Sequence, residues 1–256
     1  MRKFNSTFAA TIAAVALFAG AGVRAAETTV PDYIVSAVND PARATDVPAD
    51  ARRHVAEIAA FAKIKPGESV VDLIPGSGYF TRVFAKIVGP NGHVYDVWPD
   101  KYASEAADDV KGTQALAQQP AYSNVSAIVQ PATAFQTPAP VDVVFTSQNL
   151  HDYPDKFMGN IDITAFCKQV YAALKPGGVF LVIDHVAEAG SGLRDTDTLH
   201  RIDPAAARAA VEAAGFKFDG ESDVLRNPAD DHKKAVFDKT IRGHTDQFTY
   251  RFVKPE

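Results

Sequence analysis

From residue 49 onward, the apolar residues switch repeatedly between the spacing of an α-helix and the pattern of a buried strand. Helical spacing covers residues 50–63, 79–88, 103–118, 161–174 and 204–214. Short apolar runs rich in β-branched residues cover 69–74, 93–98, 125–129, 141–146 and 179–183. This alternation is typical of an α/β fold in which successive strands pair in parallel and helices connect them.

The end of the chain follows a different pattern. Residues 216–225 and 247–253 alternate apolar and polar side chains, as half-exposed strands do, and the polar stretch 226–244 separates them. Two adjacent strands after five strand–helix units predict an antiparallel hairpin added to a parallel sheet. We therefore predict one domain over 49–256, a three-layer sandwich around a mostly parallel seven-stranded sheet.

The first 25 residues have the composition of a cleavable signal peptide. Arg2 and Lys3 precede an apolar run over 8–19, which is too short to span a bilayer comfortably. Small or neutral residues close the segment at Ala25. We predict cleavage there, a leader over 26–48 that packs on the domain, and a periplasmic or secreted location. The alternative is an uncleaved anchor helix.

Charge and hydropathy restrict the partners. Loss of residues 1–25 would remove three basic residues and no acidic one, which moves the net charge from −5 to −8. Such a charge argues against nucleic acid as a partner. No later stretch is apolar for long enough to cross a membrane. We expect a small-molecule substrate and no stable membrane insertion after signal cleavage, while the sequence does not specify an oligomeric state.

The most informative segment is the glycine-containing turn 72–79, between a predicted strand and a predicted helix. Gly76 and Gly78 allow backbone N–H groups to approach a ligand closely, and the helix that follows favours anionic or polar atoms at its start. A dinucleotide-binding fingerprint would place glycines at positions 74 and 81, where this chain has Ile74 and Thr81. A nicotinamide cofactor is therefore disfavoured.

An acidic residue at a strand end, followed by Gly-x-Gly, resembles the cofactor loop of class I S-adenosyl-L-methionine (SAM) methyltransferases. The segments 65–67 (KPG) and 174–178 (LKPGG) are similar to turns of the same family, and the resemblance extends from about residue 50 to the C-terminus. With the signal peptide and the run 184–203, the chain resembles a family of exported predicted methyltransferases. The resemblance implies a Rossmann-like fold with SAM as cofactor, held by Asp72, Pro75, Gly76, Gly78, Trp98 and Asn149.

One of these positions departs from the family pattern. Class I enzymes usually carry an acidic residue at the end of the second strand, where it holds the ribose hydroxyls, and the aligned residue here is Trp98. Two interpretations stay open: Trp98 stacks on an adenine-sized ring, or it is a core or lid aromatic. Asp100 is a candidate replacement for the missing carboxylate.

A second polar group follows the fourth predicted strand. The stretch 149–155 resembles the His-Asp-aromatic segment of small-molecule O-methyltransferases, where the histidine removes a proton from the acceptor. An imidazole with an unperturbed pKa of about 6.5 suits that role, so we predict His151 and Asp152 as catalytic residues and Tyr153 as substrate-binding. The alternative is a polar turn that caps the next helix.

Further polar residues come from the end of the fifth strand and the loop after it. Asp184, His185 and His200 are predicted to face the same crevice and bind substrate, and the loop 187–202 is predicted to cover it. Acids and histidines of this loop offer metal ligands in principle, but no tight ligand spacing is present, so we predict no metal.

Two functions therefore stay open. The first is a SAM-dependent methyltransferase that acts on a small molecule outside the cytoplasm. The second is a non-catalytic or repurposed ligand-binding protein on the same fold, because SAM is made in the cytoplasm and Trp98 replaces the expected acid. A nicotinamide-dependent oxidoreductase is a weaker third hypothesis.

Overall fold

In the computed structural model, residues 29–256 are described, so the predicted signal peptide and the first residues of the leader lie outside them. The sheet has the strand order β3-β2-β1-β4-β5-β7-β6, in which β1 to β5 pair in parallel and β7 runs antiparallel to both β5 and β6. The predicted fold class is thereby confirmed. The strands are β1 (Ser69–Leu73), β2 (His93–Pro99), β3 (Val125–Gln130), β4 (Val141–Ser147), β5 (Leu174–His185), β6 (Lys217–Ser222) and β7 (Gln247–Val253).

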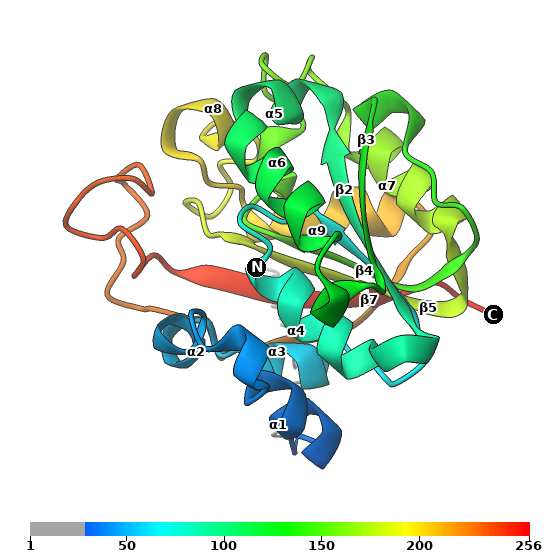
Figure 1. The fold of residues 1–256 in the computed structure, drawn as a ribbon. Coiled ribbons are helices and arrows are strands. Elements are labelled where there is room, and N and C mark those ends of the chain that lie inside the picture. Colours follow the sequence, from blue (N-terminus) through cyan, green and yellow to red (C-terminus); the bar gives the residue numbers. More distant parts are fainter. Residues whose placement is uncertain (1–28) are drawn as a thin grey trace, which may run out of the picture.

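Helices cover both faces of this sheet (Figure 1). The α-helices are α1 (Asp32–Val38), α2 (Val47–Arg53), α3 (Val55–Phe61), α4 (Tyr79–Val88), α5 (Asp100–Glu105), α6 (Ala107–Leu116), α7 (Ile163–Ala173), α8 (Thr196–Leu199) and α9 (Pro204–Ala213). Short 3-10 helices are η1 (Pro41–Arg43), η2 (Gly89–Asn91), η3 (Pro120–Tyr122), η4 (Ala132–Ala134) and η5 (Leu150–Asp152). None of the helices in residues 29–256 is long and apolar enough to cross a membrane.

Alternating side chains of the strands build two separate apolar cores. Val70 and Val143 pack with α1, α3 and α4 on one face, whereas Val71 and Val144 pack with α7 and α9 on the other. Both faces of the central strands are therefore buried, which explains why their sequences are apolar throughout. Part of the predicted leader forms α1, whose Ile34 is fully buried in the first of these cores.

The structure divides two of the predicted helices. The segment 50–63 is broken at His54, which has φ +47° and separates α2 from α3. Histidine tolerates this left-handed conformation better than β-branched residues do. The break lets α3 keep its apolar face on the core while α2 runs toward the edge of the sheet. The segment 103–118 is likewise divided at Ala106 into α5 and α6.

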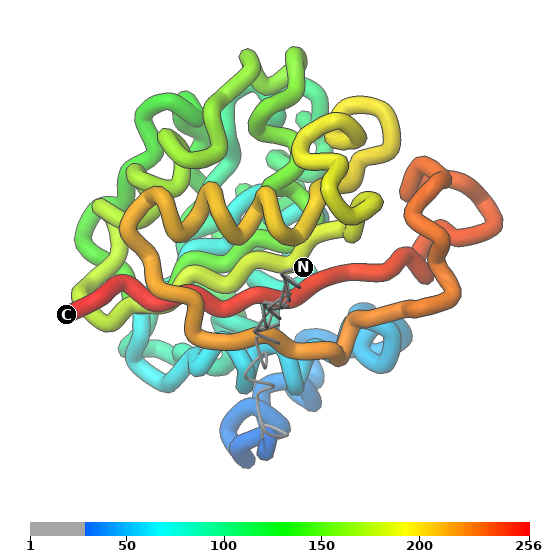
Figure 2. Tube along the Cα trace, turned by 180° about the vertical axis from the view of Figure 1, so that it is seen from behind, coloured from blue at the N-terminus to red at the C-terminus, as the bar shows by residue number. Residues whose placement is uncertain are grey.

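Two long connections meet at the carboxyl edge of the sheet, where β5 ends and β7 begins. The segment 223–246 joins β6 to β7 (Figure 2), and its Val236 N–H donates to the carbonyl of Leu199 in α8. Arg201 is fully buried between the two connections, and its guanidinium donates to the carbonyls of Val186 and Lys234 and to the carboxylate of Asp230. This arginine therefore anchors both segments to the sheet.

Removing the guanidinium should destabilise the protein strongly. Replacing Arg201 by Met leaves the Asp230 carboxylate buried without its counter-charge, a change that costs about 3 kcal/mol or more of unfolding free energy. The matched control is Arg208→Met, which removes an exposed pair with Glu212 and should cost less than about 1 kcal/mol. Chemical denaturation measures both variants, and equal small losses would contradict the anchoring role of Arg201.

Candidate active site

A cavity of about 440 Å³ opens at the carboxyl edge of the parallel strands. Its volume is typical of small-molecule sites, and open α/β sheets bind ligands at this edge. The lining includes eight residues that the sequence predicted, which are Asp72, Pro75, Gly76, Asn149, His151, Asp152, His185 and His200. The residues after β1, β4 and β5 thus converge on one space.

The loop after β1 has the left-handed backbone that its glycines permit. Gly76 has φ +56°, and a Cβ added there would have no heavy atom within 4 Å. Gly78 is the N-cap of α4 and has φ +76°, and a Cβ added there would contact Leu116. Gly78 does not line the cavity, so the close approach to a ligand falls to Gly76. Ile74 also has a positive φ, +55°, which costs a β-branched residue about 1–2 kcal/mol.

Asn149 connects this loop with the end of β4. Its Nδ2 donates to the carbonyls of Ile74 and Ser147, at 3.3 and 2.7 Å. The Ile74 N–H in turn donates to the carbonyl of Val97. These bonds hold Ile74 in its unfavourable conformation beside the cavity, as is common where a binding site fixes the backbone.

Asp72 shares the hydroxyl of Thr81 with a second buried acid. The Thr81 Oγ1 lies 2.9 Å from Asp72 Oδ2 and 2.7 Å from Asp96 Oδ1. Burial raises the pKa of Asp72 to about 7, although the bond from Thr81 acts in the opposite direction. Burial and the nearby Asp72 raise the pKa of Asp96 well above its ordinary value. A proton on one carboxyl supplies the hydrogen bond that a single hydroxyl cannot.

Trp98 and Tyr153 lie outside the cavity. Trp98 is fully buried, and its Nε1 donates to the hydroxyl of Thr113 at 3.0 Å. Tyr153 is also fully buried and stacks on Phe166 at 3.9 Å between ring centroids. Of the two interpretations of Trp98, its burial supports the one in which it is a core aromatic. The acidic residues that line the cavity and are nearest to Trp98 in the sequence are Glu105 of α5 and Asp109 of α6.

His151 is held between two carboxylates. Its Nδ1 lies 2.7 Å from Asp184 Oδ1, and its Nε2 lies 3.2 Å from Asp152 Oδ1. Asp184 also accepts the backbone N–H groups of His151 and His185, so it lies behind the cavity and orients its neighbours rather than lining it. Because a carboxylate only accepts hydrogen bonds, Nδ1 carries a proton.

These contacts change the charge that the sequence led us to expect on His151. Burial alone would lower its pKa, but Asp184 and Asp152 outweigh burial and raise the pKa of His151 to about 10. Burial likewise would raise the pKa of Asp152, whereas hydrogen bonds from His151 and His200 hold it below its ordinary value. The catalytic roles of His151 and Asp152 stay predictions. They can no longer rest on an ordinary imidazole pKa, because the pKa of His151 is raised.

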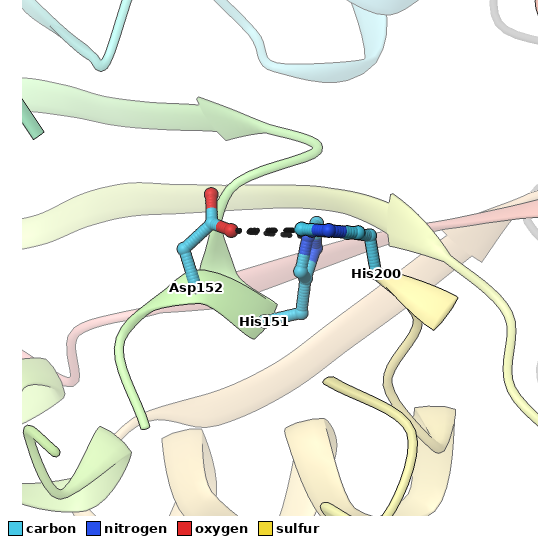
Figure 3. Close-up of side chains that lie close together, drawn as sticks. All are labelled: His151, Asp152 and His200. Atoms are coloured by element: carbon cyan, nitrogen blue, oxygen red, sulfur yellow. Dashed lines mark ion pairs between the residues drawn. The ribbon is translucent and has the colours of Figure 1, made fainter. Parts of the chain in front are cut away.

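His200 and His185 also line the cavity, beside His151 and Asp152. His200 belongs to the turn after α8, and its Nδ1 lies 3.9 Å from Asp152 Oδ1 (Figure 3). The ring of Phe237 lies edge-on to it at 4.8 Å. His185 Nδ1 lies 2.8 Å from the hydroxyl of Thr245, and burial lowers the pKa of His185 to about 4. His151, Asp152 and His200 offer ligand atoms that all lie within 4.8 Å of one another.

Comparison with models of known protein families identifies the family of the chain. Residues 64–215 match the model of a methyltransferase domain. The chain belongs to this methyltransferase family, whose cofactor is SAM.

Curated members and solved structures resemble the chain to different extents. It is 28% identical over 130 residues to a protein-L-isoaspartate O-methyltransferase of Ignicoccus hospitalis, covering 50% of this chain and 52% of that protein. It is 31% identical over 135 residues to a ubiquinone/menaquinone biosynthesis C-methyltransferase of Hydrogenovibrio crunogenus, covering 52% and 47%. The chain thus spans about half the length of the curated relatives it matches.

Two crystal structures share the fold over almost their whole length. A SAM-dependent methyltransferase from Aquifex aeolicus has a TM-score of 0.56 at 16% identity, covering 84% of this chain and 98% of its own. The [4+2]-cyclase SpnF has a TM-score of 0.60 at 16% identity, covering 91% and 98%. At such identity the likeness shows the class I methyltransferase fold alone, and one of these two neighbours is described as a cyclase.

The sequence did not identify several residues that line the cavity at the carboxyl edge of the sheet. Arg53, at the end of α2, lines it and lies 4.7 Å from the ring centroid of Tyr79, while Phe80 and Phe237 add aromatic surface. The helical pattern around Arg53 gave no sign of a break that turns α2 toward the cavity. A second cavity of about 510 Å³ shares Arg53 and Phe80 with the first and also includes Arg52 and Arg226.

The raised pKa of Asp72 predicts a pH-dependent cost in stability. A folded-state pKa of about 7, above the ordinary value of 3.8, means that the carboxyl stabilises the fold when protonated and loses this contribution as pH rises through 7. Asp72→Asn cannot ionise, so its stability relative to the parent should rise by up to about 4 kcal/mol between pH 4 and pH 8.

Denaturation at several pH values measures this difference. The control Asp108→Asn removes a fully exposed carboxylate on α6 and should follow the parent at every pH. An Asp72→Asn curve that stays parallel to the parent from pH 4 to pH 8 would show that Asp72 ionises normally.

Proposed function

We propose that this protein is a SAM-dependent methyltransferase that acts on a small molecule outside the cytoplasm. The observation that carries the proposal is the convergence of the Gly76 loop and the His151 group on one cavity. Family membership supports methyl transfer, whereas the substrate class rests on the size of the cavity and the location rests on the composition of residues 1–25.

The residues near Gly76 fit the amino-acid end of SAM. That end carries an ammonium and a carboxylate, and the chain places a carboxyl and a guanidinium in the same cavity, at Asp72 and Arg53. The two groups interact electrostatically, and burial lowers the pKa of Arg53. We assign the ammonium to Asp72 and the carboxylate to Arg53, because charge-assisted hydrogen bonds are stronger than neutral ones.

Other lining residues suit the adenosyl part. Tyr102 and Phe157 supply aromatic surface, and their rings lie 5.9 Å apart. Glu105 and Asp109 are carboxylates that can accept hydrogen bonds from the ribose hydroxyls, a role that Trp98 cannot fill from the core. Asn149 positions the loop rather than the ligand, since its Nδ2 already donates to two backbone carbonyls.

The wall of histidines and acids is the acceptor side of the cavity in this proposal. SAM supplies an electrophilic methyl group when bound, so the protein needs mainly to align the acceptor and exclude water. Asp152, His185 and His200 present hydrogen-bonding atoms to this space, while Asp184 fixes the ring of His151. The adjoining cavity gives room for the remainder of a larger acceptor, whose anionic groups Arg52 would favour.

A repurposed binding protein is the second candidate function. It is favoured by Trp98, which replaces the usual ribose-binding acid and lies in the core, and by an exported location without an evident supply of SAM. The cyclase with the same fold is a precedent for other chemistry on this scaffold. Absence of SAM binding would favour the second candidate, and methyl transfer from SAM would favour the first.

Titration calorimetry with SAM tests the cofactor. We expect binding on the order of micromolar, lost in Gly76→Val because a β-branched residue at φ +56° is strained and fills the open side of the loop. The control is Gly177→Val, at φ +74° and also open around an added Cβ, in the turn before the core of β5. Binding that is absent from the parent, or lost equally in both variants, would refute the assigned cofactor site.

Arg53→Gln tests the carboxylate contact. Loss of one charge-assisted hydrogen bond should weaken SAM about 10- to 100-fold, while adenosine, which lacks the carboxylate, should bind the parent and the variant equally. The neighbouring Arg52 is exposed and lines only the adjoining cavity, so Arg52→Gln should leave SAM affinity unchanged. An equal loss for adenosine would mean that Arg53 acts through packing alone.

A further inference from the structure

Three side chains from two distant segments place ligand atoms around one point of the cavity. His151 and Asp152 lie in η5 after β4, and His200 follows α8, forty-eight positions beyond Asp152 in the sequence (Figure 3). Their two imidazole nitrogens and one carboxylate oxygen lie within 4.8 Å of one another. We propose that His151, Asp152 and His200 bind a divalent transition-metal ion.

The orientation of His151 supports this proposal independently of the spacing. His151 Nδ1 donates its proton to Asp184 Oδ1, with 2.7 Å between the two heavy atoms, so Nε2 is the nitrogen that faces Asp152 and the cavity. Histidines that bind metals usually donate their other ring N–H to a carboxylate, which fixes the tautomer. A buried acid in this position is therefore what a metal-binding His151 requires.

The distances need only a small adjustment to suit an ion. Bonds of about 2.0–2.2 Å to nitrogen and oxygen place neighbouring ligand atoms roughly 3.0–3.5 Å apart. His151 Nε2 and Asp152 Oδ1 are already 3.2 Å apart, whereas His200 Nδ1 is 3.9 Å from the same oxygen. His200 is 30% exposed in the turn after α8, so it can move inward without repacking the core.

The donor set also indicates which ions fit. Two imidazoles and one carboxylate suit zinc, iron, cobalt or nickel, whereas magnesium and calcium prefer oxygen ligands. The carboxylates of Asp152 and Asp184 provide the compensating negative charge beside the ion. Three protein ligands leave a position open toward the cavity, as in zinc sites that bind water or substrate. His185 lies outside the set of side chains whose ligand atoms gather within 4.8 Å of one another.

The alternative occupant of the same place is a proton. In that state, His151 is an imidazolium between Asp152 and Asp184, and His200 is only a neighbour. The metal ion and the proton predict different roles for His200. His200 is needed to bind an ion, but it is not needed for the ion pair between His151 and Asp152.

Metal titration of the protein without an affinity tag tests the proposal and needs no methyl acceptor or SAM. We expect one Co²⁺ per chain, detected by its visible absorption and displaced by Zn²⁺ but not by Mg²⁺, with affinity on the order of micromolar or tighter. His200→Ala should weaken Co²⁺ at least about 100-fold, and Asp184→Asn about 10- to 100-fold. The exposed His244 lies outside the cluster, so His244→Ala should bind like the parent.

Circular dichroism and thermal unfolding of each variant show that a loss is not due to misfolding. His200→Ala removes a partly exposed side chain and should fold like the parent, and Zn²⁺ should raise the melting temperature of the parent but not of this variant. The proposal is overturned if the parent does not bind Co²⁺ at submillimolar concentration. It is also overturned if folded His200→Ala binds Co²⁺ as the parent does, or if His244→Ala loses binding equally.

Discussion

Parallel pairing of β1, β4 and β5 is the constraint on which the rest of the structure depends. Because the three strands run in the same direction in fixed register, Leu73 pairs with Thr146 and Ser147 pairs with Ile183. Each strand therefore delivers its following loop to the same edge. Gly76, His151 and His185 share a cavity for this reason, although they are far apart in sequence.

The carboxyl edge of the sheet carries backbone conformations and buried acids that cost stability. Ile74, Gln148 and His200 have positive φ without being glycine, and all three line the cavity. Two buried acids lie beside them, Asp72 in the lining and Asp184 behind it. Strained backbone and buried charge each cost stability, so the two apolar cores must supply the difference. Such costs persist where they hold side chains for a ligand, which connects the stability of the fold to its site.

Local pattern was sufficient for the fold and for part of the site. The alternation of spacing predicted the parallel strands and the antiparallel end, because both faces of the central strands are buried. The loop at Gly76 was recognisable because its chemistry is contiguous. The position of Arg53 was beyond such reasoning, because Arg53 reaches the cavity only where α2 ends at His54. His200 was predicted to face the crevice, but its approach to Asp152 depends on the path of the loop after β5, which local pattern does not give. Ligand spacing along the chain cannot indicate the proposed metal site for a similar reason, since its three candidate ligands come from two segments.

Two unusual positions beside the site have different consequences. Ile74, where a dinucleotide-binding fingerprint would have glycine, keeps a left-handed backbone because the bonds with Asn149 and Val97 hold it, so the path of the loop does not need a glycine there. Trp98 replaces an acid and turns into the core, where Thr113 accepts its Nε1 proton, so a polar contact at the end of β2 is lost outright. The nearest lining carboxylates belong to α5 and α6 instead. In the proposed function, the Gly76 loop therefore still holds the amino-acid end while the ribose contact moves to α5 and α6, and affinity for SAM depends on whether those helices compensate for the strand.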